Sequence, residues 1–418
     1  MVNLLRTKKS LFSKTAIMLF FSLLTSAMAW ADQTPVSYVD ANGQTHFVTE
    51  YTEVTSSMSP YWSKGTYVVK GDVDINHRIV LNGDVNLILT DGCKMTVTTT
   101  TDAWYDYAIE SFYVEVKIAD GQVLSDGTNI YTGTLTDDEV NAIGAQPLYA
   151  VTGLALTKDG SNVTATFDGT SLNTLSIPVD VNVNSIALNR TFSENKCATI
   201  MLPFGKDVSQ IEGGKFYTFG GVEQNGDKWE ATMNEVVGSI EANTPYLVMP
   251  SATSLTFNGG ATLNTTGGGN QQTAKTDSHW TFKGTYAYKE WIADGTNADE
   301  ICSVYGFAGV QKSDVEVGDF VCVASGAKIR PMGCYLIWND EANEASARRM
   351  APASEEMPQR IAVRLVSANG VTTAIGELDT KTGEFSFNDW FSLDGSKLSG
   401  KPTEKGVYIN NGKKVVIK

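Results

Sequence analysis

The sequence predicts an all-β protein of several domains: a β-solenoid or meander first, a β-sandwich-like middle, and a small β-module at the C-terminal side. Three observations lead to this fold class. Short apolar runs alternate with Asn-Gly, Asp-Gly and Gly-Gly turns, among 38 glycines in 418 residues. From Val73 to Val97 apolar residues occupy most odd positions and polar residues most even ones, the period of a strand with one buried face. The length favours two to four domains.

Residues 1–31 have the pattern of a signal peptide. Basic residues at positions 6, 8, 9 and 14 precede an apolar run from Ala16 to Leu24, and Ala29-Trp30-Ala31 fits the cleavage site. The apolar run is too short to span a membrane comfortably, and no other run reaches that length. We therefore expect an exported protein, secreted or on the outer cell surface, without a transmembrane segment in the mature chain.

The region 32–135 is expected to be the meander or solenoid. It opens with a predicted hairpin over residues 36–48, around Asn42-Gly43. The tripeptide Gly-Asp-Val occurs at positions 71 and 83, a step of twelve residues. Such a step fits either the hairpins of a meander or the turns of a small solenoid, and the sequence leaves both open.

Residues 136–183 are predicted to form a short helix and connecting strands. Thr136 is the expected N-cap of a helix over residues 137–143, and Glu139 completes a capping box. The strands are expected after it, between further Asp-Gly turns.

Residues 184–339 are predicted to form a β-sandwich-like domain, because many short strands with turns between them are typical of that architecture. The region also contains a weak internal echo. Ile240 lies six residues before Tyr246, which starts Tyr-Leu-Val, and Ile329 lies six residues before Tyr335, which starts Tyr-Leu-Ile. The echo suggests two related halves.

Residues 340–358 are rich in Ala, Glu and Ser and contain two prolines, so we expect a linker there. Residues 359–418 follow as a small C-terminal β-module, which includes expected strands at 361–365 and 385–387. Its last part has turns at Asp394-Gly395 and Asn411-Gly412, and the second turn predicts a closing hairpin.

The charge of the chain argues against a nucleic-acid partner. Without residues 1–31 the chain has 28 Lys and Arg against 47 Asp and Glu, a net charge of about −19, which would repel phosphates. Of the five cysteines, Cys322 and Cys334 lie on expected strands, so a disulfide between them is left open.

The familiar catalytic motifs are absent from the sequence. It contains no Gly-x-Ser-x-Gly, no His-Glu-x-x-His and no phosphate-binding loop, and its three histidines are not at metal-ligand spacing. His77 falls on the apolar face of its strand and is interpreted as a structural residue. We therefore expect a protein that is not an enzyme and holds no cofactor, apart from calcium.

Three carboxylates are candidate ligands for calcium. Asp72, Asp74 and Asp84 fall on the polar face of the regular stretch and could line up across neighbouring rungs, as calcium ligands do. The alternative is a solvated acidic face.

Two groups of aromatic residues are candidates for a glycan-binding surface, because aromatic faces stack on the apolar faces of sugar rings. The competing interpretation places the same residues in the core. The six candidates are Trp104, Tyr105, Tyr107, Tyr286, Tyr288 and Trp291.

The C-terminal module resembles the sorting domains of type IX secretion cargo in Bacteroidota. The resemblance covers about sixty residues and lies in Leu393-Asp-Gly395, in Gly406-Val-Tyr-Ile409 and in Gly412-Lys-Lys-Val-Val-Ile-Lys418. The chain lacks the Pro-Asn-Pro-type opening of that family. The resemblance implies a tail that is recognised by the export and sorting machinery and then removed. The matching tail positions are Gly406, Tyr408, Gly412, Lys413, Lys414 and Lys418.

The region 186–338 is similar to a segment of uncharacterised secreted proteins of the same bacteria, a resemblance that brings no activity with it. The stretches that carry it are 189–192, 199–204, 243–247, 318–320 and 329–332. We expect an adhesin-like or glycan-binding surface protein, whose partner is a polysaccharide or a host or cell-surface protein. The alternatives are a calcium-assisted, polysaccharide-active lyase and a purely structural surface component.

Overall fold

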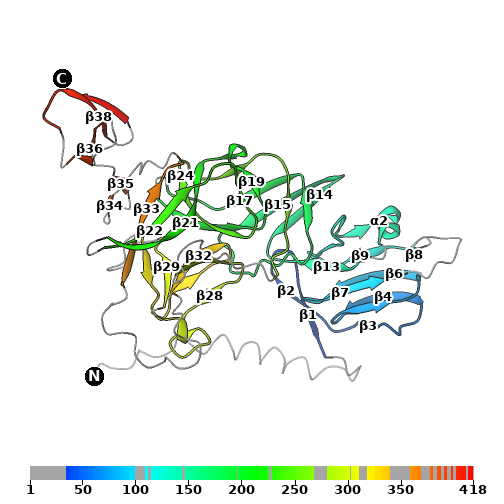
Figure 1. The fold of residues 1–418 in the computed structure, drawn as a ribbon. Helices are drawn as coiled ribbons and strands as arrows, with labels where there is room; N and C mark the ends of the chain where they lie inside the picture. Colours follow the sequence, from blue (N-terminus) through cyan, green and yellow to red (C-terminus); the bar gives the residue numbers. More distant parts are fainter. Residues whose placement is uncertain are drawn as a thin grey trace, which may run out of the picture.

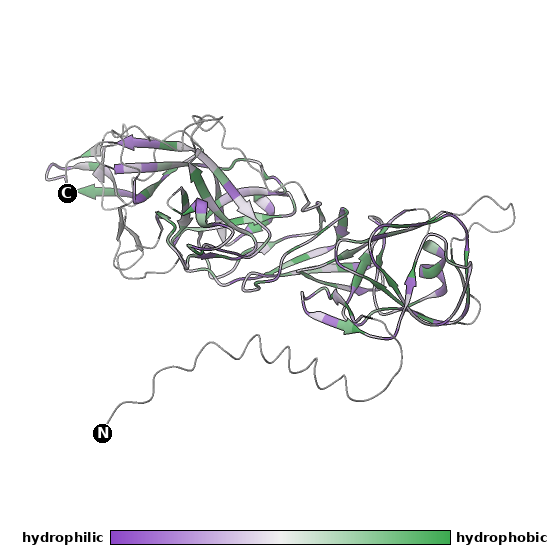
Figure 2. Cartoon of the chain, turned by 90° about the horizontal axis from the view of Figure 1, so that it is seen from below, coloured by the Kyte–Doolittle hydropathy of each residue, from purple (hydrophilic) through white to green (hydrophobic). Residues whose placement is uncertain are grey.

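The structure is a computed structural model, and it describes residues 34–98, 109–111, 114–143, 146–194, 196–225, 228–267, 280–301, 303–309, 318–338, 358–368, 377–379, 384–386, 390–392, 397–398, 402–410 and 413–417. Strands dominate these residues, which confirms the all-β fold class. An N-terminal unit and a middle unit follow one another end to end along the long axis of the molecule (Figures 1 and 2). The last strands form a separate small sheet (Figure 1). Among the described residues no helix has the length and apolarity to cross a membrane.

The N-terminal unit consists of two sheets around one core. The first has the order β12-β9-β6-β4-β3, and the second the order β11-β10-β13-β7-β5. Their bounds are β3 Thr52–Val54, β4 Tyr61–Val69, β6 Ile79–Leu89, β9 Val116–Ile118 and β12 Thr134–Leu135, then β5 Val73–Ile75, β7 Lys94–Val97, β10 Val123–Ser125, β11 Ile130–Tyr131 and β13 Leu148–Val151. A further short strand, β8 (Ile109–Ser111), pairs with β6.

Parallel pairing makes the first part of this unit a solenoid rather than a meander. Strands β3, β4, β6 and β9 are parallel neighbours, and so are β5 and β7. Tyr61 faces Val80 and Val73 faces Met95, so one turn takes about 20 residues, not twelve. The two Gly-Asp-Val copies therefore do not stack. Gly71 follows β4 with a φ of 90°, whereas Gly83 lies inside β6, where a Cβ would come within 2.7 Å of the Lys64 nitrogen.

The alternation from Val73 to Val97 predicts the core correctly, because Val73, Ile75, Ile79, Leu81, Val85, Leu87, Leu89, Met95 and Val97 are all buried. The outer face of the sheet is partly covered as well. The predicted hairpin, β1 (Val36–Val39) and β2 (Thr45–Val48), belongs to a small cluster in which Tyr38 packs with Val68 and Ile88.

The predicted helix is α2 (Asp137–Ala142). Glu139 N–H donates to the Thr136 hydroxyl, and the Glu139 carboxylate accepts from Thr136 N–H at 2.9 Å, so the capping box is confirmed. Val140 is buried in the core of the N-terminal unit. The helix therefore packs on the solenoid.

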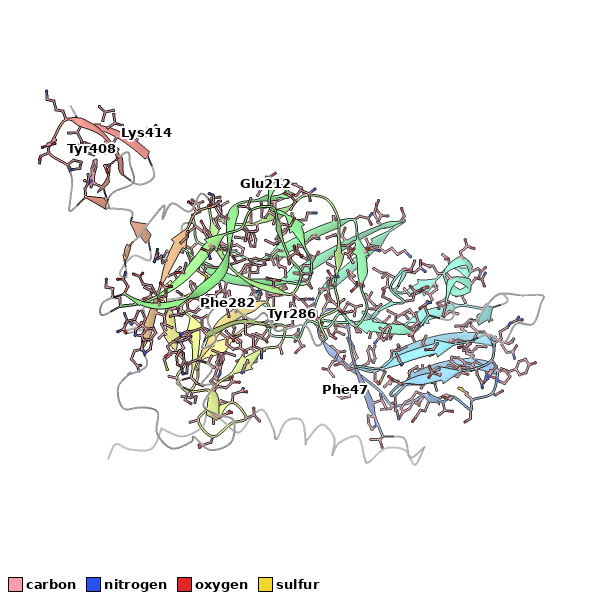
Figure 3. The ribbon with its side chains drawn as sticks, viewed as in Figure 1. Phe47, Glu212, Phe282, Tyr286, Tyr408 and Lys414 are labelled. Carbon is pink, nitrogen blue, oxygen red and sulfur yellow. The ribbon has the colours of Figure 1, made fainter. Side chains whose placement is uncertain are left out.

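The middle unit contains a sheet of nine strands in the order β18-β24-β21-β22-β33-β30-β29-β32-β27. Their bounds are β18 Ala198–Leu202, β21 Gly214–Asn225, β22 Lys228–Glu235, β24 Thr244–Pro250, β27 Trp280–Thr285, β29 Val304–Phe307, β30 Phe320–Cys322, β32 Gly333–Trp338 and β33 Arg360–Val366. The core between its two halves is aromatic, and Figure 3 shows Phe282 and Tyr286 inside it. Phe282 contacts Phe219 and Phe320, both at 5.8 Å between ring centres.

The two halves are repeats of one another, as the echo suggested. The strand order β18-β24-β21-β22 of the first half corresponds to β27-β32-β29-β30 of the second. At the midpoint of each echo lies a non-glycine residue of positive φ, Asn243 at 56° and Met332 at 66°. Asn243 N–H donates to the Leu202 carbonyl and Met332 N–H to that of Thr285, each at 2.7 Å.

Even a small accessory pair recurs in the two halves. Lys206 faces Ile240 in the pair β19 (Lys206–Asp207) and β23 (Ser239–Ile240). Lys289 faces Ile329 in the pair β28 (Lys289–Glu290) and β31 (Lys328–Ile329). The middle unit is therefore an internally duplicated fold.

Strand β33 lies between the two repeats, at the centre of the sheet, and this corrects the placement of residues 361–365 in the C-terminal module. It is parallel to β22, with Ala231 opposite Val363, and antiparallel to β30, with Phe320 opposite Ile361. Figure 1 shows β33 (orange) beside β22 (green). Ile361 is fully buried, so its apolar alternation reflects this core. The expected linker, residues 340–358, lies outside the described residues apart from Pro358.

A second sheet of the middle unit connects it to the N-terminal unit. Its order is β14-β15-β17-β25-β20, and a separate pair, β16 with β26, lies beside it. The bounds are β14 Ala155–Asp159, β15 Asn162–Asp168, β16 Val181–Val183, β17 Ser185–Asn189, β20 Ile211–Glu212, β25 Thr256–Phe257 and β26 Ala261–Leu263. One hydrophobic cluster runs from Val123 and Ile130 through these strands to Leu365, so the two units share a core.

The C-terminal strands form the order β37-β36-β38-β39. The bounds are β36 Trp390–Phe391, β37 Lys397–Leu398, β38 Gly406–Asn410 and β39 Lys413–Ile417, and β34 (Glu377–Asp379) pairs separately with β35 (Glu384–Ser386). The predicted closing hairpin is present, since Gly406 faces Ile417 and Asn410 faces Lys413.

Candidate functional site

A groove lies where the N-terminal unit meets the second sheet of the middle unit. It has a volume of about 470 Å³. Three segments form it: the turn between β10 and β11, the turn between β14 and β15, and strand β16. Its lining residues are Ser125, Gly127, Thr128, Asn129, Ile130, Lys158, Gly160, Ser161, Val163, Val181 and Asn182. This volume is within the range of small-molecule sites in proteins.

The groove has an aliphatic part and a polar part. Ile130 and Val181 are buried and Val163 is half-buried, while Thr128, Asn129, Ser161 and Asn182 are exposed. The polar side chains offer hydroxyl and amide groups, which both donate and accept hydrogen bonds. The combination suits a ligand with C–H faces and many hydroxyl groups.

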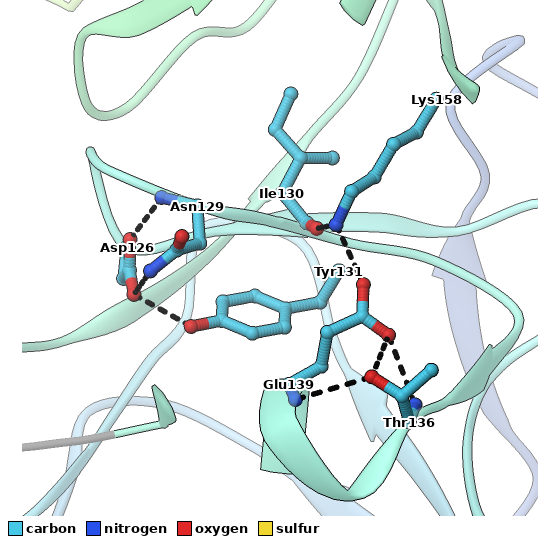
Figure 4. Close-up of polar contacts among 7 residues, drawn as sticks. All are labelled: Asp126, Asn129, Ile130, Tyr131, Thr136, Glu139 and Lys158. Atoms are coloured by element: carbon cyan, nitrogen blue, oxygen red, sulfur yellow. Dashed lines mark hydrogen bonds and ion pairs between the residues drawn. The ribbon is translucent and has the colours of Figure 1, made fainter. Parts of the chain in front are cut away.

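Lys158 connects the groove to the helix (Figure 4). Its Nζ donates to the Glu139 carboxylate at 2.6 Å and to the Ile130 carbonyl at 3.2 Å. Burial raises the pKa of Glu139, but the hydrogen bonds from Lys158 and Thr136 outweigh it, and the pKa lies below its usual range. Glu139 therefore stays ionised and neutralises the cation that lines the groove.

Asp126 holds the turn that forms one wall (Figure 4). Its Oδ1 accepts the N–H groups of Thr128 and Asn129 at 2.8 and 2.6 Å, and its Oδ2 accepts the Tyr131 hydroxyl at 2.7 Å. Burial raises the pKa of Asp126, yet these hydrogen bonds bring it below the ordinary value. Gly127 has a φ of 90°, and a Cβ there would lie 2.9 Å from Val179, so the turn packs closely on the middle unit.

The groove is not predictable from the sequence, because it is assembled from three segments that are distant in sequence. The signal in the sequence was weak: an Asp126-Gly127 turn and an Asp159-Gly160 turn, each of which marks only a local hairpin. Nothing in the sequence brings the two turns together.

A second groove of about 470 Å³ lies elsewhere at the junction of the units. Its lining residues are Val39, Gly43, Asp91, Gly92, Thr152, Asn173, Thr174 and Ser176. Asn173 Nδ2 donates to the Asn42 carbonyl at 2.9 Å, which ties the β1–β2 turn to the middle unit. This groove lacks a lysine and a helix contact among its lining residues.

The aromatic platform is not formed by the described candidates. Tyr286 and Trp291 are 2% and 1% exposed, so both belong to the core. The Tyr286 hydroxyl donates to Asn243 Oδ1 at 2.8 Å, and burial raises its pKa. Trp291 Nε1 donates to Glu300 at 2.7 Å. Tyr288 is half-buried with its hydroxyl on Glu290 at 3.2 Å, and the three candidates at 104, 105 and 107 lie outside the described residues.

The three aspartates do not line up, which corrects the expected calcium row. Asp84 lies in β6 of the first sheet, whereas Asp74 lies in β5 of the second and Asp72 just before it. Lys64 pairs with Asp84 at 3.0 Å and Lys94 with Asp72 at 3.7 Å. In the described ranges no three His, Cys, Asp or Glu residues are grouped to hold a metal.

The possible disulfide is also corrected. Cys322 and Cys334 do not form a disulfide, and β29 lies between their strands, because Tyr305 faces Cys322 on one side and Leu336 of β32 on the other. His77, expected on the apolar face, is half-buried, and its Nε2 has no hydrogen-bond partner.

Among the tail candidates, Gly406 and Tyr408 lie in β38, and the Tyr408 hydroxyl donates to the Glu404 carbonyl at 3.1 Å. Lys413 and Lys414 lie in β39, and Lys414 is exposed, as Figure 3 shows at the outer end of the chain. Gly412 and Lys418 lie outside the described residues.

Comparisons with known protein families, with curated proteins and with solved structures find no match for this chain.

Proposed function

We propose that this chain is a glycan-binding, adhesin-like protein of the cell surface, without catalytic activity, and that the groove around Lys158 is its binding site. One observation carries the proposal: the aliphatic side chains of Ile130, Val163 and Val181 line the groove together with the hydroxyl and amide groups of exposed side chains. Sugars present the same two chemistries, C–H faces and hydroxyl groups, and bind through them.

The charges around the groove favour an uncharged glycan. The Lys158 ammonium is neutralised by Glu139 at 2.6 Å, and the Asp126 carboxylate is occupied by N–H groups of its own turn. The exposed groups that remain are neutral donors and acceptors. An anionic glycan would also meet a protein of formal net charge −15.

The location at the cell surface is part of the proposal. It is supported by the signal-peptide pattern of residues 1–31 and by the resemblance of the C-terminal module to sorting domains. The export and sorting machinery would then be the first partner, and a polysaccharide or a glycosylated surface protein the second.

A glycan array with residues 32–418 tests the binding function. The variant Ser161→Trp places a large ring in the groove, and Ser251→Trp makes the same change at an exposed site that does not line it. We expect a specific neutral glycan to bind the unchanged chain and the control, and to lose binding at least tenfold in Ser161→Trp. Equal binding by both variants would contradict the assignment of the groove, and a blank array would contradict glycan binding.

A further inference from the structure

Arg190 lies beside β18, an end strand of the nine-stranded sheet, where β18 contacts β32 of the second repeat. It follows β17, and its Nη1 donates to the Thr199 carbonyl of β18 at 2.9 Å. The guanidinium lies 4.7 Å from the centre of the Phe192 ring, a cation–π distance. The side chain also passes over Gly169, where a Cβ would lie only 2.6 Å from that of Arg190. The guanidinium is therefore held in one position by three segments.

Within the described part of the chain, no carboxylate is paired with this cation. Arg190 is half-buried, its Nη1 donates to a carbonyl, and no carboxylate of the described ranges forms an ion pair with it. Burial lowers the pKa of the Arg190 guanidinium; the buried Cys334 thiol opposes this shift, and the positive charge of Arg330 adds to it. A partly buried charge without a partner is costly to the fold, so such an arrangement favours an anion from outside.

Arg330 supplies a second cation beside the first. It is exposed, and it begins the turn that Gly333 N–H closes onto the Arg330 carbonyl at 3.1 Å. The same turn is attached to β18, because Met201 N–H donates to the Met332 carbonyl at 2.9 Å. The turn with Arg330 and the Thr199 carbonyl that holds Arg190 therefore both lie along β18, where the first repeat contacts the second. We call this contact the seam of the middle unit.

The carboxylate of Asp168 lies near this pair and contributes a negative charge. Asp168 accepts the hydroxyl and N–H of Thr170 on its Oδ1, at 2.7 and 2.8 Å, and these bonds hold its pKa below the usual range, with a smaller contribution from Arg330. Arg330 therefore acts on a carboxylate whose Oδ1 already has two donors. The local charge stays positive, on a chain that is acidic as a whole.

We propose that Arg190 and Arg330 form a binding site for the carboxylate group of an acidic sugar, at the seam of the middle unit. The guanidinium fork of arginine matches a carboxylate with two parallel hydrogen bonds. Asn189 and Thr191, which flank Arg190 in the chain, and Thr170, which follows Gly169, are exposed and offer hydroxyl and amide groups to the sugar ring. The site is built from other residues than the groove, and the inference holds whether or not the groove binds a glycan.

The experiment is an NMR titration of the full chain with glucuronate, glucose and acetate. We expect glucuronate to bind and to raise the melting temperature, and glucose to do neither. Binding should weaken at least tenfold in Arg190→Gln and in Arg330→Gln, and Arg190→Lys should restore only part of it. Lys328→Gln removes the same charge two residues from Arg330 and should leave binding unchanged, as should Ser161→Trp in the groove.

Three outcomes would overturn the proposal. Glucose binding as tightly as glucuronate would remove the role of the carboxylate. Acetate binding as tightly as glucuronate would remove the role of the sugar and point to any carboxylate, including that of a peptide. Undiminished glucuronate binding by Arg330→Gln, which changes an exposed side chain and leaves the core intact, would remove the role of the arginine pair even if Arg190→Gln fails to fold.

Discussion

The hydroxyl group of Thr199 makes two hydrogen bonds with the backbone of Cys334: it accepts the Cys334 N–H at 3.1 Å and donates to the Cys334 carbonyl at 3.3 Å. Thr199 belongs to the first repeat and Cys334 to the second. One side chain thus takes the place of a pair of ladder hydrogen bonds between β18 and β32. Both residues are buried, so water does not compete for these groups.

Thr199→Val keeps the shape of the side chain and removes both hydrogen bonds. The Cys334 N–H and carbonyl would stay buried without partners, and we expect the free energy of unfolding to fall by roughly 1–3 kcal/mol. Urea denaturation measures the change. Thr218→Val, at an exposed threonine whose bond to the Asn234 carbonyl is 3.4 Å long, is the matched control. Equal losses in the two variants would show that the seam bonds contribute nothing.

Glu139→Gln should reduce stability at neutral pH and change its dependence on pH. The pKa of Glu139 is lower in the folded protein than its ordinary value of about 4.3, so its contribution is fully present above that value and is lost as the pH falls through the folded pKa. Both partners of the Lys158–Glu139 pair are about a quarter exposed, at 27% and 26%, so we expect roughly 1 kcal/mol after screening. Unfolding at pH 7 and pH 3 should show the difference between variant and parent shrinking at the lower pH.

The same comparison has an internal check in Asp126, whose pKa is also lowered by hydrogen bonds. The contribution of Asp126 to stability should be lost over the same acidic range. This loss should be seen in the parent and equally in Glu139→Gln, because that variant keeps Asp126. A stability difference that stays constant between pH 7 and pH 3 would contradict the role assigned to the Glu139 carboxylate.

Trp291→Ala should act on folding rather than on binding. The ring is buried against Tyr335, at 5.7 Å between ring centres, and its Nε1 holds Glu300. Loss of a buried tryptophan costs roughly 3–5 kcal/mol. Tyr61→Ala, at a ring 63% exposed, should change stability by less than about 0.5 kcal/mol. A Trp291→Ala protein with an unchanged melting temperature and lost glycan binding would restore the aromatic platform.

Truncation should show whether β33 belongs to the middle unit or to the C-terminal module. A chain that ends at residue 368 keeps the whole nine-stranded sheet, and one that ends at residue 338 loses its central strand. We expect cooperative unfolding and a dispersed NMR spectrum from the first and neither from the second. If the shorter chain unfolds as cooperatively as the longer one, β33 is not part of the middle core.

Local patterns in the sequence were sufficient for local structure. The alternation from Val73 to Val97, the Thr136–Glu139 capping box and the Asn411-Gly412 hairpin each depend on residues close together in the chain. The echo of Ile240 and Ile329 predicted the duplication, because the two halves keep the same spacing between a paired isoleucine and the next strand.

What the sequence did not provide is the partner of each strand. Period-two alternation is the same in a parallel and in an antiparallel strand, so it could not decide between solenoid and meander. Burial of Tyr286 and Trp291 likewise depends on what packs over them, which a stretch of sequence does not contain. The groove depends on three such distant pairings at once.

The position of β33 determines when the nine-stranded sheet can be completed during folding. The first repeat ends at an unpaired edge, β22, and the second at β30, until residues 360–366 arrive and complete both ladders at once. If the chain crosses a membrane from its N-terminal end, these residues follow both repeats. Strand β33 is the last strand of the nine-stranded sheet in the chain, so this sheet cannot be completed until nearly seven-eighths of the chain has emerged.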